Sequence, residues 1–264
     1  MTENKVIMDF SGIYREEGYS FGSSCTWLDF RNLQGVNGYC EPRAMEEIRE
    51  KIKELSYEGI HFLDSGNYHY LSKFWLEKIE EPFSLLVFDN HTDMQEAAFF
   101  GLLSCGSWVK DQLDTNGFLK EVCVLGPSRQ AFEECSREDR RRIREIPAEE
   151  FSKENLLEDF LERNSQLPLY LSIDKDLLST EAARTNWDQG EVSLSSLLSW
   201  IRQAFEKRYI LGADICGENP QDTQEPPRRE DLEINGRTNR TLLELLEHEM
   251  SSQKENTEKN RSYT

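Results

Sequence analysis

The sequence predicts an α/β fold built around a mostly parallel sheet, and two observations carry that prediction. Short apolar runs alternate along the chain with segments whose apolar residues recur at helical spacing. No repeat of solenoid period and no linker rich in Pro, Gly or Ser interrupts the alternation. Because strands that alternate with helices are joined by right-handed crossovers, the strands line up in parallel with helices on the faces. We therefore expect a single domain over residues 1–250.

The predicted strands are short runs of apolar, β-branched or aromatic residues, each of a length that suits a buried strand. In chain order they cover residues 5–10, 60–63, 84–88, 121–125, 169–173 and 209–215. Between them, apolar residues at helical spacing predict helices over residues 44–55, 71–79, 137–144, 153–163 and 194–207.

The C-terminal part has a different composition. Residues 219–231 are rich in Pro and charge, which is typical of a surface loop. Four leucines at helical spacing predict a helix over residues 238–250: Leu242, Leu243, Leu245 and Leu246. Residues 251–264 have almost nothing to bury, so they predict a disordered polar tail.

The composition is that of a folded chain, since its 264 residues include 14 Phe, 9 Tyr and 5 Trp. The 50 Asp and Glu against 31 Lys and Arg give a net charge of -19, which repels phosphate backbones and anionic membranes. We therefore expect neither a nucleic-acid nor a membrane partner. The chain shows no signal-peptide pattern, no run of about 18 apolar residues and no CxxC pair among its six Cys, so we expect a cytoplasmic protein with reduced thiols.

The most informative segment is residues 84–93, an apolar strand whose end carries Asp89, His91 and Asp93. Period-2 spacing in an extended chain places the three side chains on one side. Ligands of open α/β sheets bind beyond the carboxyl ends of the strands, which is where these residues fall. A polar turn that caps a helix is the alternative, but a cap needs only one such residue.

Two other strand ends carry related residues. One strand ends in Asp174 and Asp176, and another leads through a glycine turn to His69 at the start of a helix. Taken alone, the two carboxylates would fit a solvated turn and the histidine a packed or capped position. Together with the first motif, they predict one polar crevice at the edge of the sheet.

Charge arithmetic indicates what such a crevice would hold. Four carboxylates in one crevice repel one another, and two divalent cations would neutralise them. Carboxylate and imidazole donors without a thiolate favour Mn²⁺ over structural Zn²⁺. Two such ions can hold a bridging hydroxide and polarise an electrophile beside it. We therefore predict two Mn²⁺ per chain, with other divalent metals as the alternative.

These motifs resemble the metal-binding signatures of the ureohydrolase family, which includes arginase, agmatinase and formimidoylglutamase. The resemblance spans roughly residues 5–220 and rests on Asp89-x-His91-x-Asp93, Ser172-x-Asp174-x-Asp176 and the upstream His69. It implies a three-layer α/β/α arginase-like fold and metal binding by the two histidines and four aspartates. It also implies hydrolysis of a C–N bond in a small guanidino or amidino substrate. Relatives commonly form trimers or hexamers, which makes a homo-oligomer an expectation.

Two further positions enter through the resemblance. Residues 212–220 resemble a late arginase strand that ends in Glu-x-Asn-Pro, whose Glu faces the guanidinium, so Glu218 is expected to bind substrate. Where arginases and agmatinases usually carry a proton-transferring His, this chain has Cys105. A thiol can exchange protons, but its ordinary pKa of about 8.5 and its geometry differ from those of imidazole. A small buried residue is the alternative role for this cysteine.

The main hypothesis is a binuclear manganese hydrolase of linear amidines, with the substrate left open. One alternative is a non-catalytic homologue that binds metal or guanidino compounds. The other is a deacetylase-like amide hydrolase, but those enzymes use a His pair, and none of the four His of this chain is followed by another. Turnover of guanidino compounds distinguishes the main hypothesis from the non-catalytic alternative.

Overall fold

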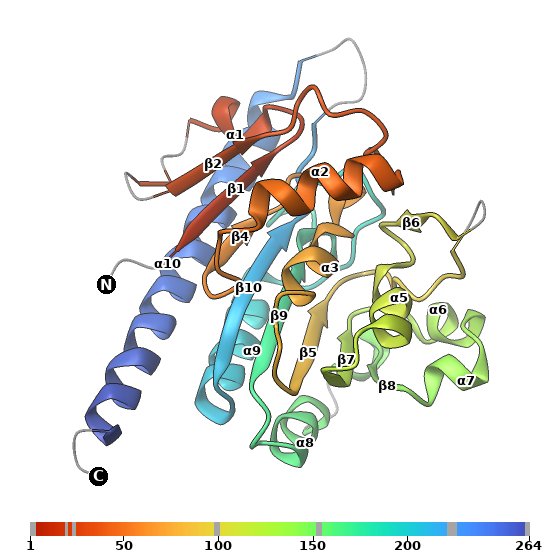
Figure 1. The fold of residues 1–264 in the computed structure, drawn as a ribbon, viewed down its shortest axis with the longest axis vertical. Helices are drawn as coiled ribbons and strands as arrows, with labels where there is room; N and C mark the ends of the chain where they lie inside the picture. The colour runs from red at the N-terminus through yellow and green to blue at the C-terminus, as the bar shows by residue number, and fades with distance from the viewer. Residues whose placement is uncertain are drawn as a thin grey trace.

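An eight-stranded sheet in which every pairing is parallel runs through the centre of the structure (Figure 1). The computed structural model describes residues 4–18, 21–22, 25–97, 101–151, 155–220 and 226–261. The strand order is β2 (Cys25–Asp29), β1 (Lys5–Asp9), β4 (Ile60–Phe62), β10 (Ile210–Cys216), β9 (Leu169–Asp174), β5 (Phe83–Phe88), β7 (Leu119–Leu125) and β8 (Ile143–Ile146). A separate antiparallel pair joins β3 (Tyr39–Cys40) to β6 (Leu103–Ser104).

Helices of the described residues connect these strands and fall into longer and shorter ones. The longer helices are α2 (Pro42–Ile52), α3 (Leu71–Leu76), α5 (Trp108–Thr115), α6 (Arg129–Glu134), α8 (Leu156–Arg163), α9 (Leu194–Lys207) and α10 (Arg229–Arg261). The shorter ones are α1 (Ile13–Glu16), α7 (Arg137–Arg140) and the 3-10 turns η1 (Gly66–Tyr68), η2 (Ala148–Glu150) and η3 (Lys175–Leu177).

The helices cover both faces of the sheet and give the predicted three layers. One apolar core joins a face of the sheet to α2, α3 and α5 through Ile48, Trp75 and Trp108. A second core joins the other face to α8, α9 and α10. Figure 1 shows α2, α3 and α5 in front of the sheet and α9 and α10 behind it. The central strands β5, β9 and β10 are buried at every position, as expected for parallel strands covered on both faces.

One predicted helix is wrong in its second half. Residues 137–144 were expected to be helical, but α7 ends at Arg140 and strand β8 begins at Ile143. Among the described residues this strand pairs only with β7, so it lies at the edge of the sheet. Its middle residues are Arg144 and Glu145, so it lacks the apolar run by which the buried strands were recognised.

The C-terminal helix is longer than the sequence pattern indicated. Helix α10 continues to Arg261, where a disordered tail was expected from residue 251. The side-chain amide of Gln253 explains part of this length, since it accepts a hydrogen bond from Ile210 N at 2.8 Å and donates one to Ile210 O at 2.9 Å. The helix also starts inside the predicted surface loop, of which residues 221–225 lie outside the described part of the chain. Within that part, no helix is both long and apolar enough to span a membrane.

Candidate metal centre

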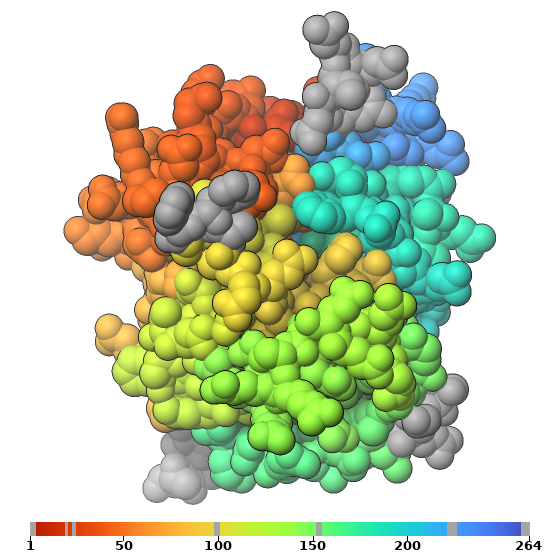
Figure 2. Space-filling model, turned by 90° about the vertical axis from the view of Figure 1, so that its right-hand side faces the viewer, coloured from red at the N-terminus to blue at the C-terminus, as the bar shows by residue number. Residues whose placement is uncertain are grey.

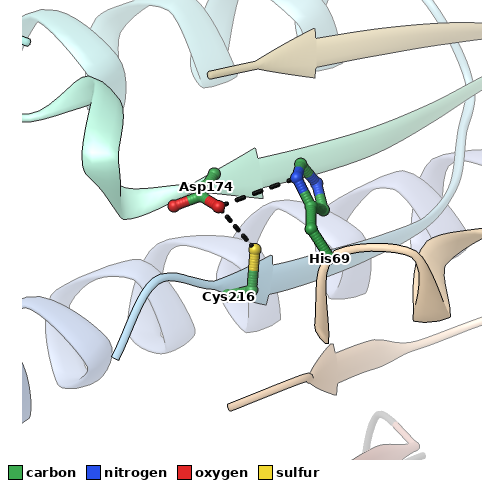
Figure 3. Close-up of side chains that lie close together, drawn as sticks. All are labelled: His69, Asp174 and Cys216. Atoms are coloured by element: carbon green, nitrogen blue, oxygen red, sulfur yellow. Dashed lines mark hydrogen bonds and ion pairs between the residues drawn. The ribbon is translucent and has the colours of Figure 1, made fainter. Parts of the chain in front are cut away.

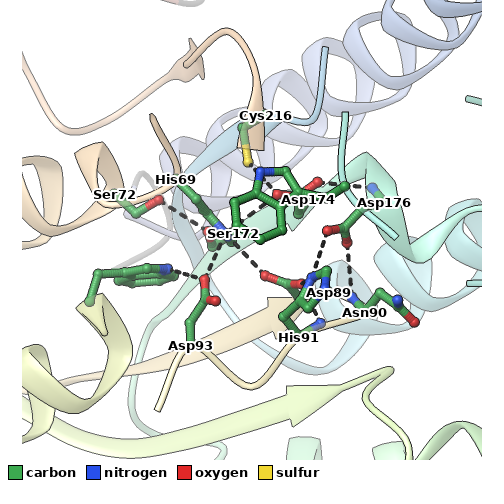
Figure 4. A network of polar contacts seen from close by, with 12 residues as sticks. His69, Ser72, Asp89, Asn90, His91, Asp93, Ser172, Asp174, Asp176 and Cys216 are labelled. Carbon is green, nitrogen blue, oxygen red and sulfur yellow. Dashed lines mark hydrogen bonds and ion pairs between the residues drawn. The ribbon is translucent and has the colours of Figure 1, made fainter. Parts of the chain in front are cut away.

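The six predicted metal ligands gather at the carboxyl end of the sheet (Figure 4). Asp89 directly follows β5, and Asp174 is the last residue of the neighbouring strand β9. His69 directly follows η1, the turn that comes after β4. Because the carboxyl ends of parallel strands meet at one edge, the fold brings these distant residues together.

His69 faces three of the aspartates. Its Nδ1 atom is 3.0 Å from Oδ2 of Asp89, 3.0 Å from Oδ2 of Asp93 and 3.6 Å from Oδ2 of Asp174. All four side chains are buried. One imidazole nitrogen and three carboxylate oxygens therefore surround a single point.

His91 faces the remaining aspartate. Its Nδ1 atom is 2.8 Å from Oδ2 of Asp176 and 3.4 Å from Oδ1 of Asp89. Asp89 thus presents one oxygen to each imidazole, Oδ2 to His69 and Oδ1 to His91. A carboxylate in this position can bridge two ions.

Among the described residues, three groups of donor atoms lie within 4.8 Å of one another. The groups are His69 with Asp89 and Asp93, Asp89 with His91 and Asp176, and His69 with Asp174 and Cys216. The first and second groups share Asp89, whereas the first and third share His69. The donor atoms therefore gather around two neighbouring points, one beside each histidine.

The electrostatics of the cluster fit cations in those positions. Burial and the charge of Asp89 raise the pKa of Asp93 to about 6. Burial and the charges of Asp174 and Asp89 also raise the pKa of Asp176 well above its usual range. These carboxylates are destabilised as anions because they are buried and because other carboxylates lie close to them.

The histidines carry the compensating charge when no metal is bound. Burial opposes protonation of His91, but hydrogen bonds to Asp176 and Asp89 overcome it and raise its pKa to about 12. Burial likewise opposes the charge of His69, and the surrounding acidic groups still raise its pKa well above its ordinary value. Two divalent ions would take over this role, since their four positive charges match the four carboxylates.

A buried chain of hydrogen bonds orients His69 from behind. Its Nε2 atom is 2.9 Å from Oγ of Ser172, and that hydroxyl donates to Oδ1 of Asp214 at 2.6 Å. With Nε2–H donating to Ser172, Nδ1 is left to face the carboxylates. A carboxylate behind a ligating histidine is a recurrent support in metal sites because it fixes the ring and its tautomer.

Two other contacts hold the aspartates in place. The indole Nε1 of Trp108 donates to Oδ2 of Asp93 at 2.5 Å. The backbone N–H of Asn90 donates to Oδ1 of Asp176 at 3.0 Å. Helix α5 therefore holds Asp93 through Trp108, and the segment after β5 holds Asp176 as well as supplying His91.

The cluster forms the floor of a pocket of about 340 Å³. The rest of the lining comes from segments far apart in the chain and includes Asn37, Tyr39, Asn67, Gln95, Glu96, Cys105 and Trp187. In Figure 2 the yellow part of the chain lies between the orange N-terminal part and the teal part. The volume suits a small molecule.

The sequence profile of the arginase family matches residues 8–246. The chain belongs to the arginase family. It is also 35% identical, over 212 residues, to an uncharacterized protein of Thermotoga maritima, covering 80% of this chain and 78% of that protein.

Two solved structures show how similar the fold is. The proclavaminate amidino hydrolase of Streptomyces clavuligerus superposes with a TM-score of 0.68 at 14% identity, covering 96% of this chain and 92% of that one. The formimidoylglutamase of Bacillus subtilis gives a TM-score of 0.66 at 13% identity, covering 94% and 88%. These likenesses confirm the predicted arginase-like fold.

Cys105 lines the pocket of this arginase-family chain. Burial and the charge of Asp93 raise the pKa of the Cys105 thiol to about 12. Such a thiol stays protonated near neutral pH and cannot accept a proton readily. The raised pKa therefore favours the alternative role of a small, partly buried residue.

Glu218 is not brought to the pocket, contrary to the role that the family resemblance implied. It is absent from the lining and fully buried. Its carboxylate forms an ion pair with Lys175 and accepts hydrogen bonds from Asn235 at 3.0 Å and Asn239 at 2.8 Å. Both oxygens are therefore engaged in the interior.

Three residues near the cluster were not assigned a role from the sequence: Ser172, Asp214 and Cys216. In the register of β10 with β9, Asp214 lies opposite Ser172 and Cys216 lies opposite Asp174. Asp214 and Cys216 stand two apart at the end of a predicted strand, as the recognised ligands do. That spacing was the feature of the sequence that could have indicated their place beside the cluster.

Proposed function

We propose that this chain is a metal-dependent hydrolase that cleaves a C–N bond of a small guanidino or amidino compound. The observation that carries the proposal is the pair of donor groups joined by Asp89 at the floor of a pocket. Two divalent ions would be held there, one beside His69 and the other beside His91. Carboxylate and imidazole donors suit Mn²⁺, particularly beside His91, where no sulfur lies in the donor group.

Ions bound in these positions would supply Lewis acidity and an activated water. The chain itself would bind and orient the cationic substrate. Trp187 and Tyr39 line the pocket with 41% of each residue exposed, and their rings can pack against a planar cation. Glu96 is the one carboxylate of the described lining outside the metal cluster, so it would pair with the guanidinium or a terminal ammonium.

The lining also favours some guanidino compounds over others. The described residues around the pocket include neither Lys nor Arg. A substrate carboxylate would therefore find no cationic partner among these side chains, and Glu96 would repel it. We infer that compounds without a carboxylate, such as agmatine or guanidine, bind better than arginine or guanidinobutyrate.

The test is product release by the metal-loaded protein. Urea would be measured with arginine, agmatine, guanidinobutyrate, guanidinopropionate and guanidine, and formamide with formiminoglutamate. We expect release from at least one compound, abolished by EDTA and restored by Mn²⁺. The Asp174→Asn variant should have lower metal content and little turnover, whereas Asp188→Asn, which changes an exposed carboxylate, should behave as the wild type.

Silence across the panel from a protein that holds two ions per chain would contradict hydrolysis of these substrates. Guanidino ligands that still bind under those conditions would instead support the non-catalytic binding homologue. Equal turnover of arginine and agmatine would contradict the inferred preference against carboxylates.

A further inference from the structure

The end of β10 places a cysteine directly against the metal cluster. Cys216 is the last residue of β10, and it lies opposite Asp174, the last residue of β9. Residues paired in this way in a parallel sheet point to the same face. Their side chains meet, since Sγ of Cys216 is 3.1 Å from Oδ2 of Asp174 (Figure 3).

The same oxygen of Asp174 also faces His69. Oδ2 lies 3.6 Å from Nδ1 of His69, and Sγ completes a group whose donor atoms all lie within 4.8 Å of one another. Figure 3 shows the three side chains converging from β9, β10 and the turn before α3. Nitrogen, oxygen and sulfur donors therefore surround one point, which is the position beside His69 described above.

The backbone at Gly217, directly after Cys216, keeps the end of β10 close to the end of β9. Gly217 has a φ of +94°, and a Cβ there would lie 2.5 Å from Oδ1 of Asp174 and 2.7 Å from the backbone N of Lys175. Only glycine allows β10 to end so close to β9. The sulfur is consequently held beside Asp174 by the backbone itself.

Cys216 differs from the other cysteines in its position among potential metal ligands. Cys105 also lines the pocket, yet among the described residues neither it nor any of the remaining four cysteines belongs to a donor group. Cys216 is fully buried among potential ligands, so its sulfur is not simply one more apolar atom of the core.

We propose that Cys216 is a thiolate ligand of the metal ion beside His69. This inference rests on the proposed metal-dependent function and deepens it. When the ion binds, a metal–sulfur bond forms and the proton of the thiol passes to solvent. Sulfur donors favour Zn²⁺ and other thiophilic ions over Mn²⁺.

The two ion positions consequently differ in their metal preference. The position beside His91 has only oxygen and nitrogen donors, from Asp89, His91 and Asp176. The position beside His69 adds a sulfur. The expectation of two Mn²⁺ assumed a donor set without thiolate, and Cys216 removes that premise for one of the two ions.

Cobalt spectroscopy tests the proposal directly. A thiolate bound to Co²⁺ gives an intense near-ultraviolet charge-transfer band that carboxylate and imidazole ligands do not give. We expect this band in the Co²⁺-loaded wild type and in Cys105→Ser, the matched pocket-lining control, and its loss in Cys216→Ser. Absence of the band from wild-type protein that holds Co²⁺, or its persistence in Cys216→Ser, would overturn the proposal.

Wild-type protein gives a second measurement if Cys216→Ser fails to fold or to bind metal. X-ray absorption of the Zn²⁺-loaded form should show a sulfur scatterer at about 2.3 Å. A first shell of oxygen and nitrogen alone would contradict the assignment. Two manganese ions per chain after loading with equal Mn²⁺ and Zn²⁺ would also contradict it.

These results separate this inference from the proposed hydrolysis. A cobalt–thiolate band in a protein that hydrolyses no guanidino compound would leave the ligand assignment intact and contradict the function. Turnover by a protein without the band would support the proposed hydrolysis and contradict the assignment of Cys216 as a ligand.

Discussion

The imidazole of His69 is held from behind by the hydroxyl of Ser172, with 2.9 Å between Nε2 and Oγ. The hydroxyl in turn donates to the buried carboxylate of Asp214 at 2.6 Å. Ser172, which does not line the pocket, thus determines that Nδ1 of His69 faces the clustered carboxylates.

Ser172→Ala should therefore weaken metal binding without altering the pocket. It leaves Nε2 of His69 and Oδ1 of Asp214 without this hydroxyl, and loss of such outer support typically lowers metal affinity by about 10- to 100-fold. Chelator competition would measure the change. Ser172→Thr keeps the hydroxyl and should retain most of the affinity, so an equal loss in both variants would argue against this role.

Metal binding should release protons and strengthen as the pH rises. Hydrogen bonds to Asp176 and Asp89 overcome the effect of burial and raise the pKa of His91 from 6.5 to about 12, so His91 is protonated at pH 7 in the metal-free protein. Its charge stabilises the metal-free fold fully below pH 6.5, and this contribution is lost as the pH rises toward 12. An ion that binds Nδ1 must displace that proton.

Calorimetric titration of the metal into buffers of different ionisation enthalpy would count the released protons. The His91→Asn variant should release fewer protons than the wild type at pH 7. Equal proton release by the two proteins would show that His91 is not displaced from its protonated state.

Lys175→Met should destabilise the fold by about 3–5 kcal/mol, because it leaves the fully buried charge of Glu218 without its partner. Chemical denaturation would measure the free energy of unfolding. The double variant Lys175→Met, Glu218→Gln removes both charges and should recover much of the loss. A single variant as stable as the wild type would contradict the burial of this pair.

Glu218→Gln should leave the binding of guanidino ligands unchanged, since Glu218 does not line the pocket. Ligand titration of the folded variant would test this. A large loss of affinity in a variant of unchanged metal content would restore the substrate-facing role.

Glu96→Gln should weaken the binding of cationic ligands and leave metal content unchanged. Glu96 lines the pocket with 83% of its side chain exposed, and removing one surface charge from a cation site should cost severalfold in affinity rather than abolish binding. Direct titration with agmatine would measure the effect. Gln95→Glu adds a charge beside it and should tighten binding, whereas an opposite result would place the cation elsewhere.

Cys105→Ser should retain turnover. The pKa of the Cys105 thiol is raised to about 12, first by burial and then by Asp93, so it cannot serve as the proton acceptor near neutral pH. The measurement is kcat as a function of pH for both proteins. A loss of kcat with unchanged metal content would return Cys105 to a role in proton transfer.

Local patterns in the sequence predicted the mostly parallel α/β sheet and the clustered polar side chains, and the family resemblance added the three layers. Period-2 spacing at strand ends brought Asp89, His91 and Asp93 into one group, and the structure has them at one edge of the sheet. What the pattern could not show was register. The pairing of Cys216 with Asp174 depends on two strands far apart in the chain, and one shift would have turned the thiol away.

Glu218 was misplaced for a related reason. Lys175 stands between Asp174 and Asp176, and its side chain lies fully buried with Glu218 rather than in the pocket. A carboxylate near a predicted site looks like a substrate ligand until its internal partner is known. Lys175 can be read from the sequence, but its ion pair with Glu218 is visible only in the structure.

The position of helix α10 at the end of the fold bears on when metal ions can bind during biosynthesis. It follows every strand of the sheet in the chain, and its Asn235 and Asn239 surround the Glu218 carboxylate that pairs with Lys175. Lys175 is in turn the residue between two of the clustered aspartates. Until α10 has left the ribosome, that charged pair has no enclosing layer and the strand ends lack their internal support. We therefore expect the nascent chain to acquire its metal ions after translation of α10 rather than during synthesis of the sheet.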